Sequence, residues 1–169
     1  MSDQNPMRDI SIEKIVLNIG CGTKQNIENA KSILERISER TAVITKGKKR
    51  SLFGVPKGKP IGTKVTIRGN TNEVFSRLLK AVENTLASHN FDVTGNLSFG
   101  VKEYIDVPDM QYDPKVGIIG FDVCVRLVRP GYRISKKRMG SSLGKKHRIT
   151  KNDAIKYIQE KFGVKMEEE

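Results

Sequence analysis

Apolar and polar residues alternate along several stretches of the chain, and this period of two predicts β-strands. The stretches span residues 12–20, 42–46, 63–68, 101–107 and 118–128. In the first, Ile15, Leu17 and Ile19 share one face, whereas Lys14 and Asn18 lie on the other. We therefore expect the strands to bury one face and to present a polar one.

Apolar residues spaced three and four apart predict helices between these strands. The first helix follows Asn26, a candidate N-terminal cap. The second opens with Asn70 and Glu73 in a capping-box pattern, and its apolar stripe reaches Leu86 before Asn90 ends it. These one-sided helices are expected to cover the apolar face of the strands.

A short last helix is bounded by a capping box at Thr150 and Asp153 and by Gly163. The order of elements predicts an α+β fold, a largely antiparallel open sheet with helices packed on one face and the other face free. The predicted parts are a flexible leader, a core domain and a basic C-terminal extension with the short helix, which span residues 1–9, 10–131 and 132–169.

Positive charge is concentrated in two blocks that contain no Asp or Glu. Residues 40–72 hold nine Lys and Arg and residues 123–152 hold ten, out of 31 in a chain with a net charge of +12. Localised basicity of this kind is typical of nucleic-acid binding. The chain has no long apolar run or basic amphipathic helix suited to a membrane, so we expect no membrane partner.

The first basic block coincides with the polar face of the predicted sheet. Short hydrogen-bonding groups lie there among cations, and such groups suit phosphates, 2′-hydroxyls and unstacked bases. The residues of this face are Lys14, Asn18, Thr45, Lys64, Thr66 and Arg68. The block continues into a Gly- and Pro-rich loop over residues 47–62 with an apolar tip. A solvated polar face and a nuclear-localisation type cluster remain alternatives.

Other site chemistries find little support in the sequence. Cys21 and Cys124 have no further Cys or His at metal-ligand spacing, so we expect no zinc site and no cofactor. A Rossmann site is also disfavoured, because Gln25 stands in place of the third glycine of the motif. An enzyme acting on nucleic acid would need a metal cluster, for which the candidate ligands are Glu103, Asp106, Asp109, Asp113 and Asp122. No nucleophile, paired histidine or phosphate loop accompanies them, so we predict that the chain is not an enzyme.

Three runs resemble the ribosomal protein L five family of the large subunit: LNIGCG at residues 17–22, PIGTKVTIRG at residues 60–69 and GVKE at residues 100–103. The similarity covers about residues 10–129. The tail, with RPGYRISKKR and GKKHRIT, looks like the archaeal and eukaryotic branch, whose eukaryotic members are numbered eleven. The resemblance implies a structural constituent of the cytoplasmic ribosome that holds 5S rRNA in the central protuberance.

The resemblance also implies roles for individual residues. The family's sheet contact with 5S rRNA falls on Asn18, Thr45, Lys64 and Thr66, helped by Lys46 and Lys48. The family's long loop reaches the elbow of peptidyl-site tRNA, and it corresponds to Arg50, Ser51, Leu52, Phe53, Gly54, Val55, Pro56, Lys57, Gly58 and Lys59.

Further partners implied by the resemblance are large-subunit rRNA, neighbouring proteins of the central protuberance, and a small-subunit head protein across an intersubunit bridge. Additional rRNA contacts are expected from the cations of the C-terminal extension, namely Arg133, Lys136, Lys137, Arg138, Lys145, Lys146 and Arg148. The alternative function is a basic assembly factor that meets RNA through the same two blocks without selectivity.

Overall fold

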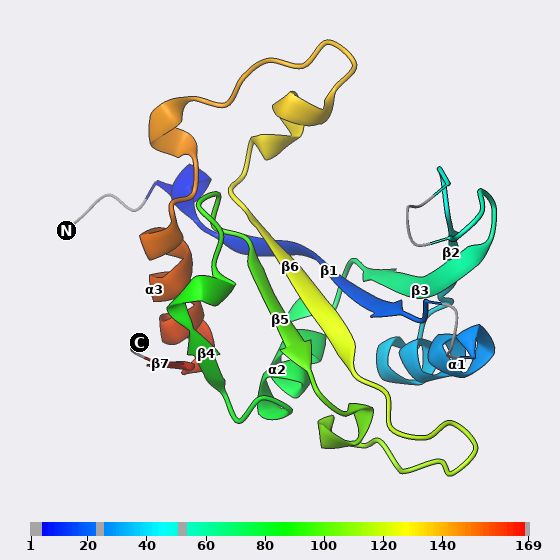
Figure 1. Cartoon of the computed structure of the whole chain (residues 1–169). Helices are drawn as coiled ribbons and strands as arrows, with labels where there is room; N and C mark the ends of the chain where they lie inside the picture. Colours follow the sequence, from blue (N-terminus) through cyan, green and yellow to red (C-terminus); the bar gives the residue numbers. More distant parts are fainter. Residues whose placement is uncertain (1–4, 23–25, 51–53, 168–169) are drawn as a thin grey trace.

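Strands from distant parts of the chain form one antiparallel sheet in a computed structural model, which describes residues 5–22, 26–50 and 54–167 (Figure 1). The sheet has five strands in the order β2-β3-β1-β6-β5. Their bounds are β1 Ser11–Gly20, β2 Val43–Lys46, β3 Pro60–Ile67, β5 Leu97–Val101 and β6 Phe121–Val128. The predicted α+β class and antiparallel sheet are confirmed.

Three α-helices in the described residues accompany the sheet: α1 Ile27–Ser38, α2 Thr71–Lys80 and α3 Lys151–Phe162. Their buried apolar residues join the inward residues of the strands in one hydrophobic core. Leu17 and Val123 are cross-strand neighbours within this core, and both are fully buried. No helix in the described part of the chain is long and apolar enough to cross a membrane.

Short elements connect the larger ones. A second sheet pairs β4 Thr85–Ala87 with β7 Lys165–Glu167 in parallel. The 3-10 helices are η1 Pro6–Arg8, η2 Ser88–Asn90, η3 Tyr104–Asp106, η4 Tyr132–Lys136 and η5 Lys145–His147. The last α-helix has the predicted capping box at Thr150 and the predicted left-handed exit at Gly163. Its Phe162 packs edge-on against Phe75 of α2 at 4.7 Å between ring centroids.

The second helix departs from its prediction at both ends. Asn70 adopts a left-handed conformation with φ of 48° and makes no side-chain cap, so the predicted capping box is wrong. The helix stops at Lys80, because Glu83 and Asn84 both have positive φ and the Asn84 amide bonds back to the Leu79 carbonyl. Leu86 therefore belongs to β4 and not to the helix.

The predicted strand over residues 101–107 is also wrong. The strand lies earlier, at β5, where Leu97, Phe99 and Val101 are buried and alternate with Ser98 and Gly100. Small polar and glycine positions hid this alternation in the sequence. The segment that follows turns into η3, whose aromatic side chain enters the core.

Candidate nucleic-acid interface

The strand register assembles the predicted polar face. Asn18 of β1 lies opposite Lys64 of β3, and Val16 lies opposite Thr66. Lys64 is exposed, while Asn18 and Thr66 are half-buried. Their neighbours along each strand point into the core, so these side chains share the face that the core does not cover.

Three further predicted residues extend this open face at its ends. Lys14 lies near the start of β1. Arg68 lies at the same end, because it directly follows Ile67, which pairs with Ile15 of β1. At the opposite end, Thr45 of β2 pairs with Gly62. The face therefore carries Lys14 and Arg68 at one end, whereas Lys64 lies beside the amide and hydroxyl groups towards the other end.

A glycine lets the strands approach closely beside Asn18. A Cβ atom on Gly62 would lie 2.4 Å from the carbonyl oxygen of Ile19, a separation that real Cβ atoms do not show. Next to it, the amides of Cys21 and Gly22 both donate to the Ile61 carbonyl at 3.0 Å. These contacts fix the end of β1 against β3, and hence the relative positions of Asn18 and Lys64.

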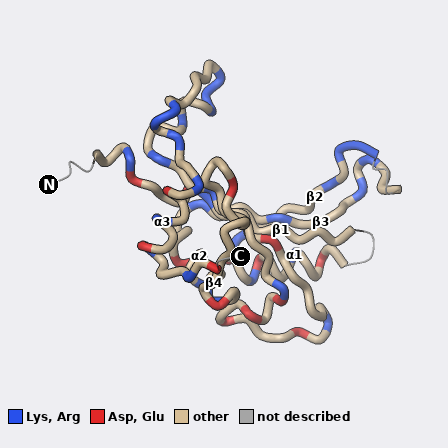
Figure 2. The backbone as a smooth tube through the Cα atoms, turned by 60° about the vertical axis from the view of Figure 1, so that its left-hand side comes forward, with Lys and Arg blue, Asp and Glu red and all other residues tan. Residues whose placement is uncertain are grey.

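The basic loop connects β2 to β3 and projects from the sheet (Figure 2). Its base is closed by two backbone bonds, from the Gly47 amide to the Lys59 carbonyl at 2.9 Å and from the Gly58 amide to the Gly47 carbonyl at 2.8 Å. The exposed cations of this loop are Lys46, Lys48, Lys49, Arg50, Lys57 and Lys59. Gly54 and Pro56 are exposed and Val55 is half-buried, whereas Ser51, Leu52 and Phe53 lie outside the described residues.

Two carboxylates interrupt the positive charge near the open face. Glu13 sits at the irregularity between the paired residues Ile12 and Lys14, and it forms ion pairs with Arg126 at 3.1 Å and with Lys136. Burial raises the pKa of Glu13, but the Lys136 hydrogen bond and the charges of Lys136, Arg126 and Lys14 outweigh it and hold that pKa below its usual value. The second carboxylate, Asp122, lies on β6.

Strand β6 adds residues that the sequence analysis did not assign to the site. Arg126 lies opposite Lys14, and Asp122 lies opposite Asn18. Both occupy outward positions of an alternating strand, and this was the signal that could have identified them.

Strand β6 also carries a cysteine, Cys124. Burial, followed by the charge of Asp122, raises the pKa of the Cys124 thiol, so that thiol is neutral near pH 7.

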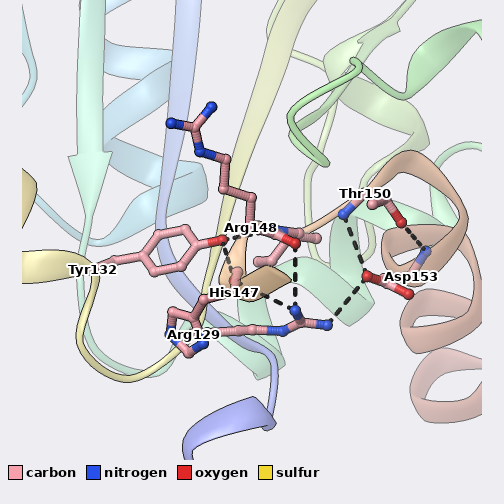
Figure 3. Close-up of polar contacts among 7 residues, drawn as sticks. Arg129, Tyr132, His147, Arg148, Thr150 and Asp153 are labelled. Carbon is pink, nitrogen blue, oxygen red and sulfur yellow. Dashed lines mark hydrogen bonds and ion pairs between the residues drawn. The ribbon is translucent and has the colours of Figure 1, made fainter. Parts of the chain in front are cut away.

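The C-terminal cations lie on a second projection, which is closed by side chains (Figure 3). The Arg129 guanidinium donates to the carbonyls of His147 and Arg148, each at 3.3 Å, and to the Asp153 carboxylate at 3.1 Å. The Tyr132 hydroxyl donates to the His147 carbonyl at 3.2 Å and accepts from the Ile149 amide at 2.7 Å. These bonds join the two ends of the segment 132–149, which we call the C-terminal loop.

The predicted C-terminal cations are exposed on this loop. They are Arg133, Lys136, Lys137, Arg138, Lys145, Lys146 and Arg148. Lys136 differs from the others because it forms an ion pair with Glu13 of β1. This loop and the β2–β3 loop are separate. The two basic loops rise from the same side of the molecule, with the sheet between them (Figure 2).

The acidic residues weighed as a metal cluster do not form one. Asp113 pairs with Arg36 at 3.4 Å, and Asp122 lies on β6 beyond the turn. No group of three or more potential metal ligands occurs within residues 5–22, 26–50 and 54–167.

Comparison with known proteins identifies the family of this chain. The family model for the C-terminus of the ribosomal L5 family matches residues 60–157, and the model described as Ribosomal protein L5 matches residues 5–51. The chain is 44% identical to the large ribosomal subunit protein uL5 of Methanococcoides burtonii, over 96% of this chain and 99% of the relative. It is 43% identical to the protein of the same name from Nitrosopumilus maritimus, over 95% of each chain. The chain therefore belongs to the ribosomal protein L5 family.

Proposed function

We propose that this protein is a structural component of the large ribosomal subunit that binds 5S rRNA through the open face of its sheet. The observation that carries the proposal is the register of β1 and β3, which sets Asn18 beside Lys64 opposite the hydrophobic core. The family is structural and non-enzymatic, and this confirms the prediction that the chain is not an enzyme.

The chemistry of the open face supports recognition of folded RNA. Each Lys or Arg that meets a phosphate releases roughly 0.7 to 0.9 counterions and makes that part of the affinity salt-dependent. The Asn18 amide and the Thr66 hydroxyl can hydrogen-bond to 2′-hydroxyls and to the edges of unstacked bases. Arg126 joins Lys14 at one end of this face, so we add it to the proposed contacts.

We assign the remaining partners to other parts of the chain. Residues 50–59 of the β2–β3 loop contact peptidyl-site tRNA. The cations of the C-terminal loop contact large-subunit rRNA. Neighbouring proteins of the central protuberance and a small-subunit head protein complete the set. Exposure and positive charge of both loops support the two RNA contacts.

The affinity of the purified protein for 5S rRNA, compared with an unrelated RNA of equal length across a salt series, tests the proposal. Lys64→Glu and Asn18→Ala should each weaken 5S rRNA binding, by about tenfold or more for the charge reversal. Both side chains face away from the core, so circular dichroism should remain that of the wild type.

Matched controls lie on the exposed surface of α2. Lys80→Glu and Asn72→Ala repeat the same changes away from the open face and should leave 5S rRNA affinity close to wild type. Equal affinities for the two RNAs, falling together with salt, would instead identify a non-selective basic RNA-binding assembly factor. Loss of binding only in the control variants would contradict the assignment to the open face.

A further inference from the structure

A cavity of about 730 Å³ lies beneath the C-terminal loop. Its walls come from the turn before β5, from the end of β6 and from both ends of the loop. Val93, Leu143 and Ile149 supply apolar surface, and Val93 is 82% exposed. Ligand pockets in proteins commonly have volumes of roughly 300 to 1,000 Å³, so the cavity can hold a small organic group.

The charged side chains that line this cavity are all cationic. Arg126, Lys145 and Arg148 line it, and none of the described lining residues is acidic. Arg126 forms an ion pair with Glu13, whereas Lys145 and Arg148 make no ion pair with a described carboxylate. The side chain of Arg148 leads away from the Arg129 cluster that holds its backbone (Figure 3). The cavity is therefore suited to an anionic group at its mouth.

The walls of the cavity are held in place by contacts that involve its lining residues. Tyr132 and Ile149 both line it and are joined by the 2.7 Å hydrogen bond between amide and hydroxyl. The turn that carries Val93 is seated on Ile149, because a Cβ atom on Gly95 would lie 2.5 Å from the Ile149 side chain. The opening therefore exists before any ligand arrives.

We infer that this cavity takes one unpaired nucleotide of an RNA, with its phosphate at Lys145 and Arg148 and its base against the apolar wall. Apolar surface next to cations suits a nucleotide, since a base has two apolar faces and its phosphate is anionic. The Ser142 hydroxyl on the lining can meet the polar edge of a base. The inference rests on the proposed binding of rRNA by the C-terminal loop, and it adds a site for an extruded base.

An RNA hairpin with a single bulged 2-aminopurine, compared with the same hairpin without the bulge, provides the probe. We expect the full-length protein to bind the bulged hairpin about tenfold more tightly, as for one base transferred to a protein surface, and to change its fluorescence. Ser142→Trp fills the cavity and removes no charge, so it should abolish this preference and leave affinity for the paired hairpin unchanged. Ser141→Trp is the matched control, because Ser141 is exposed in the same loop but does not line the cavity.

Charge variants separate the cavity from general attraction. Arg148→Ala should reduce the preference for the bulge, whereas Lys137→Ala, which lies outside the cavity, should weaken both hairpins equally. Binding of both hairpins without any preference, or a preference that survives Ser142→Trp, would overturn the inference and leave the proposed rRNA contact standing. If neither hairpin binds to the cations of the C-terminal loop, the proposed contact between this loop and rRNA is itself overturned. A hexaglutamate peptide that binds in a Ser142-dependent way, when RNA does not, would assign the cavity to an acidic protein segment.

Discussion

The two basic regions of this protein are built by different means. The open face is a product of backbone pairing: once β1, β3 and β6 are in register, Asn18 and Lys64 become neighbours. The C-terminal loop has no such frame, and the side chains of Arg129 and Tyr132 hold its ends together. A basic surface can therefore be held in place by regular strand pairing or by a few individual side-chain contacts.

Replacing Arg129 should separate the two regions most clearly. Arg129→Ala removes a side chain that is only 11% exposed, and it takes one donor each from the Asp153 carboxylate and from the carbonyls of His147 and Arg148. We expect the free energy of unfolding to fall by about 2–4 kcal/mol, measured by urea denaturation. Amide exchange should rise mainly over residues 132–149. Arg133→Ala, a change at an exposed residue of the same loop, is the control. If Arg129→Ala lowers 5S rRNA affinity tenfold, the loop and the open face are not independent.

A glycine substitution should have the converse effect. Gly62→Ala forces a Cβ atom against the Ile19 carbonyl and displaces β3 from β1. We expect a loss of about 1–3 kcal/mol in unfolding free energy, together with weaker 5S rRNA binding, because Lys64 moves relative to Asn18. Gly144→Ala, where a Cβ atom meets nothing within 4 Å, should be close to neutral. Wild-type stability of Gly62→Ala would refute the close approach.

The smallest effect is expected where the two regions meet. Glu13 of β1 binds Lys136 of the extension, and its pKa is lowered in the folded state. A carboxyl with a depressed folded pKa stabilises the protein above its unfolded pKa and loses that contribution as pH falls through the folded value. Glu13→Gln should therefore cost about 0.5 kcal/mol at pH 7. The difference from wild type should shrink as pH falls below the usual pKa of glutamate and vanish only below the lowered pKa of the folded state. Urea unfolding at several pH values checks this, and a difference that persists in acid would exclude the ion pair as its cause.

The sequence predicted the regions that follow a period. Alternation in β1, β3 and β6 correctly placed Asn18, Lys64 and Thr66 on the same face. The resemblance to the ribosomal family is likewise confirmed by the family models. The division of the chain at residue 131 stays a prediction, although Ile158 of the extension is fully buried in the shared core.

The missed features depend on contacts that no local pattern reveals. Leu86 continues the apolar stripe of α2, but two left-handed residues reverse the chain before it. Arg129 was one of ten cations in its block, and its partners lie 18 to 24 positions away in sequence. The cavity beneath the C-terminal loop combines residues from separate segments, so it exists only once these segments have packed.

The central place of β1 has a consequence for the order in which this protein can be made. β1 pairs with β3 after a connection that includes α1, but its other edge must wait for β6, whose Val128 meets Ser11. A chain emerging from synthesis can therefore complete Asn18 and Lys64 as a pair while the opposite edge of β1 is still open. Contacts of such long sequence separation form slowly. The open face is thus assembled in two halves, and Arg126 arrives with the second.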